Sequence, residues 1–452
     1  MAAKKQQQAS SAPSRWRLAA GALAAGALFL HLPASAITLQ QAYEKAVQHD
    51  PTFRVAYYGN QATRENSNIA RSYLLPSVSG SYSSSEAKSD ITVGKTTSHR
   101  EYMSKSANVS LRQAIFNLEA LARYRQGVAQ GLASDAQLEA ARQTLILRVV
   151  AAYIDAIYTE DQLALGRAQR DLLAEQQKVN DRLYKAGEGT VTDRLETQAK
   201  LDLAEARLLE LEDAQRAARV TLAGIIGEEV QSLDRLRPDF AVRPSDRNSY
   251  KDWVAVALAR NPELQAYQHS ITAAHEEVNR ARAGHVPRVD FVASISKADS
   301  ESISTLGQDS DTKSIGFQMS VPIFSGGAIS ASTRQARATE QRAKAELDAK
   351  AAAVMVDLRK EYDALTSSVA RIAALEKAVE SAQLLMKATE QSIKGGVRIN
   401  LDLLNAQESR YLAERDLAQA RYNYLLNTLR LRAASGTLSG DDVRDLGSYF
   451  TR

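Results

Sequence analysis

The stretches Val-Ser-Leu-Arg-Gln-Ala-Ile-Phe at residues 109–116 and Phe-Gln-Met-Ser-Val-Pro-Ile-Phe at residues 317–324 parallel each other at an offset of 208 residues. Two proline pairs repeat at an offset of 211, with the members of each pair 25 residues apart: Pro51 with Pro76, and Pro262 with Pro287. Gly187 and Gly396 add a landmark at an offset of 209. Landmarks that recur in one order at nearly constant spacing indicate an internally duplicated chain.

Each repeat is predicted to run helix, strand, strand, very long helix, turn and long helix. The first repeat covers residues 37–240, the second covers residues 241–435, and residues 436–452 form a C-terminal tail. The expected elements are strand pairs at about residues 77–86 with 104–115 and 289–298 with 312–323, and long helical hairpins at 117–226 and 327–434.

The serine-rich runs after the prolines alternate apolar and polar residues. In one of them Val289, Phe291 and Ile295 share a face, and Asp290 and Ser294 lie on the other. A period of two with one apolar face is the pattern of a half-buried strand. Runs of about 9–10 residues have the length of a tilted membrane-crossing strand. The polar segments between paired strands are expected to be exposed hairpin tips: residues 87–100 and 299–311.

The predicted helices are unusually long. No proline occurs from Leu118 to Lys185 or from Ile329 to Lys394, and each segment would measure roughly 100 Å as a helix. The second segment carries apolar residues at steps of three and four, which is a coiled-coil seam with a period near 3.5: Leu347, Ala351, Val354, Leu358, Tyr362, Leu365, Val369, Ile372, Leu375 and Val379.

Residues 1–36 have the pattern of a removable export signal peptide. Four basic residues precede an apolar stretch at residues 18–32, and Ala34-Ser35-Ala36 forms a small-residue cleavage site. A membrane anchor is the alternative, but the stretch is short and is interrupted by His31 and Pro33. Removal of the signal peptide takes four of the 57 basic residues and leaves 53 basic and 53 acidic residues. The mature chain then has no net positive charge, and its composition gives no indication of nucleic-acid binding.

The chain contains no cysteine, which excludes disulfides, cysteine-based metal or nucleophile sites, and a lipoprotein anchor. The five mature histidines include no i,i+4 pair, and no phosphate-binding or hydrolase motif occurs. Acidic residues are frequent in long helices by composition alone, so paired carboxylates do not indicate acid–base catalysis. We therefore predict no catalytic site, no metal and no cofactor; this chain is not expected to be an enzyme.

Four strands per chain pose a physical problem if they cross a membrane. Every backbone N–H and C=O group in lipid must be paired, and about eight strands make the smallest known barrel. Several copies of the chain must then contribute strands to one barrel. Two copies give eight strands and three give twelve, and the hydrogen-bonding requirement alone does not decide the number of copies. The alternative is a soluble periplasmic coiled-coil adaptor or scaffold protein in which the strands form an ordinary sheet.

Residues 395–407, Gly-Gly-Val-Arg-Ile-Asn-Leu-Asp-Leu-Leu-Asn-Ala-Gln, closely resemble a helical hairpin tip of TolC-family outer-membrane proteins. Residues 187–198 look like the same hairpin in the first repeat. Residues 113–116 and 321–324 resemble the strand-ending signature of the family, with Ala114 in place of the first proline. The resemblance covers essentially the whole mature chain.

The resemblance implies a mainly helical fold with a membrane β-barrel portion. Three copies would form a homotrimer whose twelve-stranded outer-membrane barrel continues into a long coiled-coil helical barrel in the periplasm. Such a channel-tunnel passively exports proteins or small molecules, as in efflux and type I secretion systems. It works when an inner-membrane ABC or proton-driven transporter and a periplasmic adaptor (membrane fusion) protein engage it, and docking opens its tip gate.

The resemblance also implies specific gate residues at the tips. Arg398 would tie its hairpin to Thr192 and Asp193 of a neighbouring one, because a guanidinium can bind two groups at once. Asp402 would form a ring of carboxylates that binds cations at the pore constriction. A solvated helix face is the alternative for each of these side chains.

Two gate positions depart from the family pattern. Ile393 stands where relatives carry a tyrosine latch, and Asn405 stands where they often carry a second aspartate. The entrance is therefore expected to have one acidic ring and a looser latch. Adaptor contacts would fall on the residues of the two hairpin tips: Gly187, Glu188, Gly189, Thr190, Gly395, Gly396 and Val397.

Overall fold

The computed structural model describes residues 36–243, 249–300 and 307–451. The predicted signal peptide therefore lies outside the described residues except for Ala36. The helices in these ranges are α1 (Leu39–His49), α2 (Pro51–Ser72), α3 (Leu118–Ala186), α4 (Val191–Ile226), α5 (Tyr250–Arg260), α6 (Pro262–Ala283), α7 (Ala328–Lys394), α8 (Asn400–Ala434) and α9 (Gly440–Gly447). None of these described helices combines the length and apolar character that a membrane-crossing helix needs.

The repeated Asp-Pro and Asn-Pro pairs form equivalent helix starts. The Asp50 carboxylate caps α2 by accepting from the N–H of Phe53 at 2.6 Å. Its counterpart at the start of α6 is Asn261, whose side chain accepts from the N–H groups of Glu263 and Leu264 at 2.9 and 3.2 Å. Proline follows each cap as the first helical residue, where its missing N–H has no cost.

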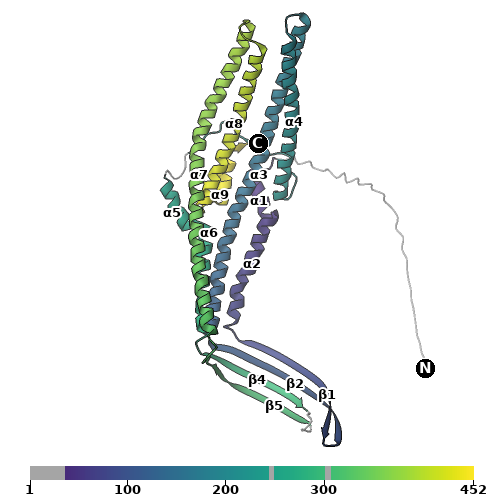
Figure 1. Cartoon of the computed structure of the whole chain (residues 1–452), viewed down its shortest axis with the longest axis vertical. Coiled ribbons are helices and arrows are strands. Elements are labelled where there is room, and N and C mark those ends of the chain that lie inside the picture. Colours follow the sequence, from purple (N-terminus) through teal and green to yellow (C-terminus); the bar gives the residue numbers. More distant parts are fainter. Residues whose placement is uncertain (1–35, 244–248, 301–306, 452) are drawn as a thin grey trace, which may run out of the picture. The chain divides into compact units, whose positions relative to one another are not determined.

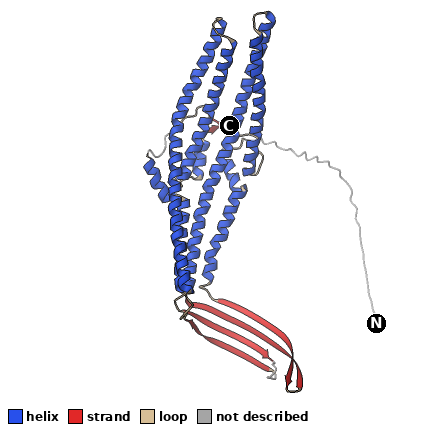
Figure 2. Ribbon diagram, in the orientation of Figure 1, coloured by secondary structure: helices blue, strands red, loops and turns tan. Residues whose placement is uncertain are grey.

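The four long strands form one antiparallel sheet in the order β1-β2-β4-β5, which Figure 2 shows in red. They are β1 (Ser77–Val93), β2 (Thr96–Phe116), β4 (Arg288–Ser300) and β5 (Gln308–Ser320). In this single chain β1 and β5 are the edge strands. Two short strands, β3 (Arg235–Leu236) and β6 (Phe450–Thr451), form a separate pair.

The strands differ in length from the sequence prediction. The segment 87–100, expected to be a loop, belongs mostly to β1 and β2, which are joined by a turn at Gly94 and Lys95. Polar cross-strand pairs continue the ladder there: Lys88 with Glu101 at 2.7 Å and Thr92 with Thr97 at 2.9 Å.

The second predicted loop, residues 299–311, also lies partly in strands. Its ends belong to β4 and β5, and residues 301–306 lie outside the described residues. At the other end, β5 stops at Ser320 rather than at the predicted residue 323. Pro322 explains this earlier end, because proline has no N–H for a ladder.

The two faces of the sheet have different chemistry. The apolar face includes Tyr82, Val109, Ile295 and Ile315, all more than half exposed in the single chain. The opposite face is rich in hydroxyl groups, and three pairs of serines hydrogen-bond across neighbouring strands: Ser79 with Ser110, Ser83 with Ser106, and Ser294 with Ser314. The alternation predicted from the sequence is therefore present in the sheet.

Figure 1 shows α3 with α4 as one long hairpin and α7 with α8 as another. The helix α3 has 69 residues and α7 has 67, so each measures roughly 100 Å at 1.5 Å per residue. Helices α2 and α6 pack on α3, and α6 also packs on α7, so the two repeats are in contact along these helices.

The coiled-coil seam predicted in α7 is only partly buried. Val354, Leu358 and Ile372 are at most 4% exposed, but Val369 is 40% exposed and its neighbour Ser368 is buried. A straight helix drifts by about 20° per heptad against a repeat of 3.5 residues. This drift carries Val369 away from the buried face of the single chain.

The main core lies at the middle of α3 and includes the segment predicted as a C-terminal tail. Tyr153 is fully buried, its hydroxyl donates to the carbonyl of Ile37 at 2.8 Å, and its ring meets Phe450 edge to face. The tail contains α9 and β6, and Val443 and Leu446 of α9 are buried in the same core. These apolar residues make the C-terminal segment part of the folded body.

Candidate gate at the helical hairpin tips

The first tip joins α3 to α4 through Gly187, Glu188 and Gly189. The N–H groups of Glu188 and Gly189 both donate to the carbonyl of Leu183, at 2.9 and 3.1 Å. A Cβ on Gly189 would lie 3.0 Å from the backbone nitrogen of Tyr184. The chain therefore passes so closely over the end of α3 that a side chain at residue 189 would force the turn to shift.

Asp193 has a local role in this tip. The Thr190 hydroxyl accepts from the N–H of Asp193 at 3.0 Å and donates to its carboxylate at 2.6 Å. The Asp193 carboxylate also accepts from the backbone N–H of Thr190 at 3.4 Å, which completes a reciprocal capping box and satisfies two backbone donors at the start of α4. Thr192, the other predicted latch partner, is exposed on the same first turn.

The second tip joins α7 to α8 through Gly395, Gly396, Val397, Arg398 and Ile399. Val397 is 82% exposed, and Ile399 precedes α8 without a side-chain cap. All seven predicted adaptor-contact residues are exposed except Gly189, which is half-buried. A docking surface must be exposed, and these residues meet that requirement. Their contacts with a periplasmic adaptor stay a prediction.

Arg398 pairs within its own hairpin. Its guanidinium lies 3.8 Å from the carboxylate of Asp402, and the two side chains are 49% and 38% exposed. An exposed pair of this kind contributes only about 0–1 kcal/mol. The described chain does not bring Arg398 to Thr192 or Asp193, and the predicted link between neighbouring hairpins is not tested by a single copy.

The two gate residues that differ from the family pattern also differ in their surroundings. Ile393 is half-buried near the end of α7, and Asn405 is exposed on α8. The backbone carbonyl of Asn405 accepts from the Ser409 hydroxyl at 2.9 Å. The weaker gate expected from these two residues remains a prediction.

A buried polar network lies next to the tips and was not predicted from the sequence. The Thr197 hydroxyl, which is fully buried, donates to the carbonyl of Asp193 at 2.9 Å. It accepts from the amides of Asn180 at 2.8 Å and Asn400 at 3.2 Å, and Gln176 donates to Asn400 at 3.0 Å. The hydroxyl thus uses its one donor and both lone pairs to join α3, α4 and α8.

One sequence signal could have indicated this network. Asn180 follows the buried Leu173 by seven residues, so it occupies the same position of the heptad. A buried asparagine at such a position specifies register in coiled coils, at a cost in stability. The partners Thr197 and Asn400 come from other helices, and their meeting depends on the tertiary fold.

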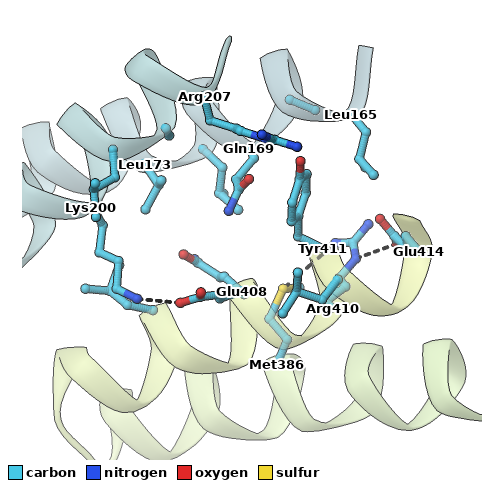
Figure 3. A pocket seen from close by; sticks show the side chains of 17 residues that line it. Leu165, Gln169, Leu173, Lys200, Arg207, Met386, Glu408, Arg410, Tyr411 and Glu414 are labelled. Carbon is cyan, nitrogen blue, oxygen red and sulfur yellow. Dashed lines mark hydrogen bonds and ion pairs between the residues drawn. The ribbon is translucent and has the colours of Figure 1, made fainter. Parts of the chain in front are cut away.

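A groove of about 430 Å³ separates the two hairpins farther from the tips. Figure 3 shows Lys200 of α4 pairing with Glu408 of α8, and Arg410 pairing with Glu414. Its walls carry leucines from three helices: Leu165, Leu172, Leu173, Leu203, Leu404 and Leu412. Of these two pairs, Lys200–Glu408 connects the hairpins across the groove, and Arg410–Glu414 lies within α8.

Metal-ligating side chains in the described part of the chain do not gather into a metal site. Among residues 36–243, 249–300 and 307–451, no group of three or more His, Cys, Asp or Glu side chains is arranged to hold a metal ion.

A family model for outer membrane efflux proteins matches residues 42–228 and 253–437. The chain is 40% identical to the alkaline protease secretion protein AprF of Pseudomonas aeruginosa, over 94% of this chain and 89% of the relative. It is 35% identical to the proteases secretion protein PrtF of Dickeya chrysanthemi, over 92% of each. A solved structure of CusC matches with a TM-score of 0.77 at 17% identity, covering 89% of this chain and 92% of that one.

We expect Thr197→Val to destabilise the folded chain by about 1–3 kcal/mol, because it removes the buried hydroxyl that accepts from the amides of Asn180 and Asn400. Thr192→Val makes the same change on the exposed first turn of α4 and should stay within about 0.5 kcal/mol. Denaturant unfolding of both variants in detergent measures the difference. Equal effects would show that the network does not hold the helices together.

Proposed function

This chain belongs to the outer membrane efflux protein family, and on that basis we propose that three copies assemble into one export duct. The protein is an outer-membrane channel protein with the fold of this family. In the proposed trimer the sheets close a barrel in the membrane, and the long helical hairpins form a tunnel in the periplasm. The relatives are channels rather than enzymes, and the proposal includes no catalytic step.

The observation that carries the proposal is the four-stranded sheet with its two open edges. Ile315 and Phe317 on β5 are 77% and 72% exposed, and Val78 and Tyr82 on β1 are 66% and 70% exposed. Lipid can cover these side chains, but it cannot satisfy the backbone groups of an edge strand. Pairing between copies supplies the missing hydrogen bonds. A soluble scaffold would leave this apolar face in water.

We propose that the cargo includes secreted proteins. Two relatives that match nearly the whole chain are named for protease secretion, and this supports a polypeptide cargo over small molecules alone. An inner-membrane ABC transporter and a periplasmic adaptor would then supply energy and cargo. The adaptor would dock on the exposed hairpin tips. The alternative to the ABC transporter is a proton-driven transporter in the inner membrane.

The proposed gate works by an exchange of partners at Arg398. In the closed trimer Arg398 would bind Thr192 and Asp193 of a neighbouring copy, and on opening it would pair with Asp402 as in the single chain. The Arg398–Asp402 pairing is exposed and contributes little free energy, so adaptor docking would shift the balance between the two pairings at a small cost. Three Asp402 carboxylates at the constriction would attract cations.

The duct itself is tested by membrane fractionation and by planar-bilayer recordings. We expect a heat-sensitive trimer in outer-membrane fractions and discrete channels from the purified protein. A cell that lacks the gene should lose secretion of its protein cargo and regain it on complementation. Recovery of the protein as a monomer without conductance would contradict the proposal.

Arg398→Ser should raise the conductance of the closed channel, because it removes the proposed latch between copies. Arg410→Ser is the matched control, since Arg410 forms an i,i+4 pair with Glu414 on the same helix away from the tip. Single-channel recordings compare the two variants. The latch is refuted if Arg398→Ser leaves conductance unchanged.

Asp402→Ala should abolish block by divalent cations added from the periplasmic side, because it removes the proposed ring of carboxylates. Asp416→Ala removes the same charge elsewhere on α8 and should leave the block unchanged. The readout is the concentration of divalent cation that halves the current. Persistent block in Asp402→Ala would place the cation site on other residues.

A further inference from the structure

Three neighbouring strands each carry an exposed lysine on the apolar face of the sheet. These are Lys105 on β2, Lys297 on β4 and Lys313 on β5. Residues directly opposite each other in a sheet share a face. Lys297 lies opposite Ala107, Lys313 lies opposite Ile295, and Lys105 follows Ala107 by one step on the same face. The lysines therefore continue the apolar face toward the far ends of the strands.

The three lysines lie at similar distances from the base of the sheet, where the strands meet the helices. Lys105 is 11 residues from Phe116 at the end of β2. Lys297 is 9 residues from the start of β4. Phe324 parallels Phe116 in the duplication, and Lys313 is 11 residues from it. The lysines thus form a row at one height, the lysine row.

The height of the lysine row agrees with the outer edge of the hydrocarbon layer. A strand rises about 3.3 Å per residue and is tilted by about 40° in a membrane barrel, so ten residues span about 25 Å of height. The outward apolar band of such barrels is also about 25 Å tall. In the proposed duct the helices leave the base on the periplasmic side. The row would then lie at the outer leaflet.

A hollow of about 490 Å³ lies beside the row. Its lining includes six residues whose side chains belong to the apolar face by the strand register: Tyr82, Lys105, Lys297, Asp299, Asp309 and Asp311. The three carboxylates lie beside the row or farther toward the ends of the strands. The order along this face is therefore apolar, then cationic, then acidic.

The lysines have little competition from the carboxylates. Lys297 lies 3.8 Å from Asp311, and both side chains are at least half exposed, so this pair contributes little. Within the part of the chain that the structure describes, Lys105 and Lys313 form no ion pair. Their ammonium groups are free to bind an external anion.

The edge strand β1 departs from this pattern. Lys88 lies 11 residues from the start of β1, but it pairs with Glu101 at 2.7 Å. Glu86 also precedes it on the same face. The lysine row is therefore limited to β2, β4 and β5, which lie side by side (Figure 1).

We propose that the lysine row binds the phosphate groups of a phosphorylated glycolipid in the outer leaflet. The acyl chains would cover the apolar face, the lysines would donate to phosphate oxygens, and the carboxylates would accept from sugar hydroxyl groups. A zwitterionic lipid would instead bring its own cation toward the lysines. This inference rests on the proposed function, because it needs the sheet to lie in the membrane, and it names the lipid class at its surface.

Binding of fluorescent diphosphoryl lipid A to the purified trimer in neutral detergent tests the proposal. A lysine near an anionic lipid surface strengthens binding about fivefold. We expect the triple glutamine variant to bind about tenfold to hundredfold more weakly, and the triple arginine variant to keep the affinity because arginine also binds phosphate. The glutamine variant combines three substitutions: Lys105→Gln, Lys297→Gln and Lys313→Gln.

The matched control makes the same change of charge in the helical body. It combines Lys360→Gln, Lys377→Gln and Lys387→Gln, three exposed positions of α7, and should bind lipid A as the natural protein does. An equal loss in the control and in the row variant would overturn the assignment to the row. Displacement of lipid A by phosphatidylcholine as readily as by unlabelled lipid A would overturn the phosphate requirement, and equally ready displacement by phosphatidylglycerol would overturn the glycolipid class.

Unheated gels show whether each variant forms the trimer. If the triple variant does not assemble, Lys313→Gln alone tests the same contact and should weaken binding about threefold to fivefold. A natural protein that forms no trimer would refute the proposed function. A conducting trimer that binds lipid A no better than phosphatidylcholine would refute the lysine row and leave the duct intact.

Discussion

The need to pair backbone hydrogen-bonding groups at the sheet edges is the constraint on which the structure depends. The edge strands β1 and β5 have 17 and 13 residues, and in hydrocarbon each unsatisfied group costs several kcal/mol. The apolar face of the sheet makes water an equally poor environment. One chain with four strands cannot meet both demands, and this is the physical reason for proposing that copies of the chain assemble.

The long helices must be held in one alignment along their length. Helices of almost seventy residues with apolar seams can slide by a heptad at little cost, because successive heptads look alike. The hydroxyl of Thr197, with partners on α3, α4 and α8, allows one alignment of the hairpins. The polar layer near the tips therefore favours one register of the hairpins, and the exposed Arg398–Asp402 pair is not part of it.

Much of the fold could be predicted from the sequence, and the failures have physical causes. The duplication, the alternating strands and the proline-free helices follow from local patterns that the structure confirms. The extension of β1 and β2 through the polar segment 87–100 was missed because paired polar side chains give no apolar alternation. The burial of Thr197 was missed because its partners come from distant segments. The predicted gate contacts involve neighbouring copies and stay a prediction.

The pairing of β2 with β4 has a consequence for assembly. In a ring of three chains there would be six seams between hairpins, and the duplication makes three of them intramolecular. Those three form at the effective concentration set by the connecting chain, and only the other three require collisions between molecules. Because two hairpins are joined in one polypeptide, closing the ring would need half as many pairing events between separate molecules as it would with single hairpins.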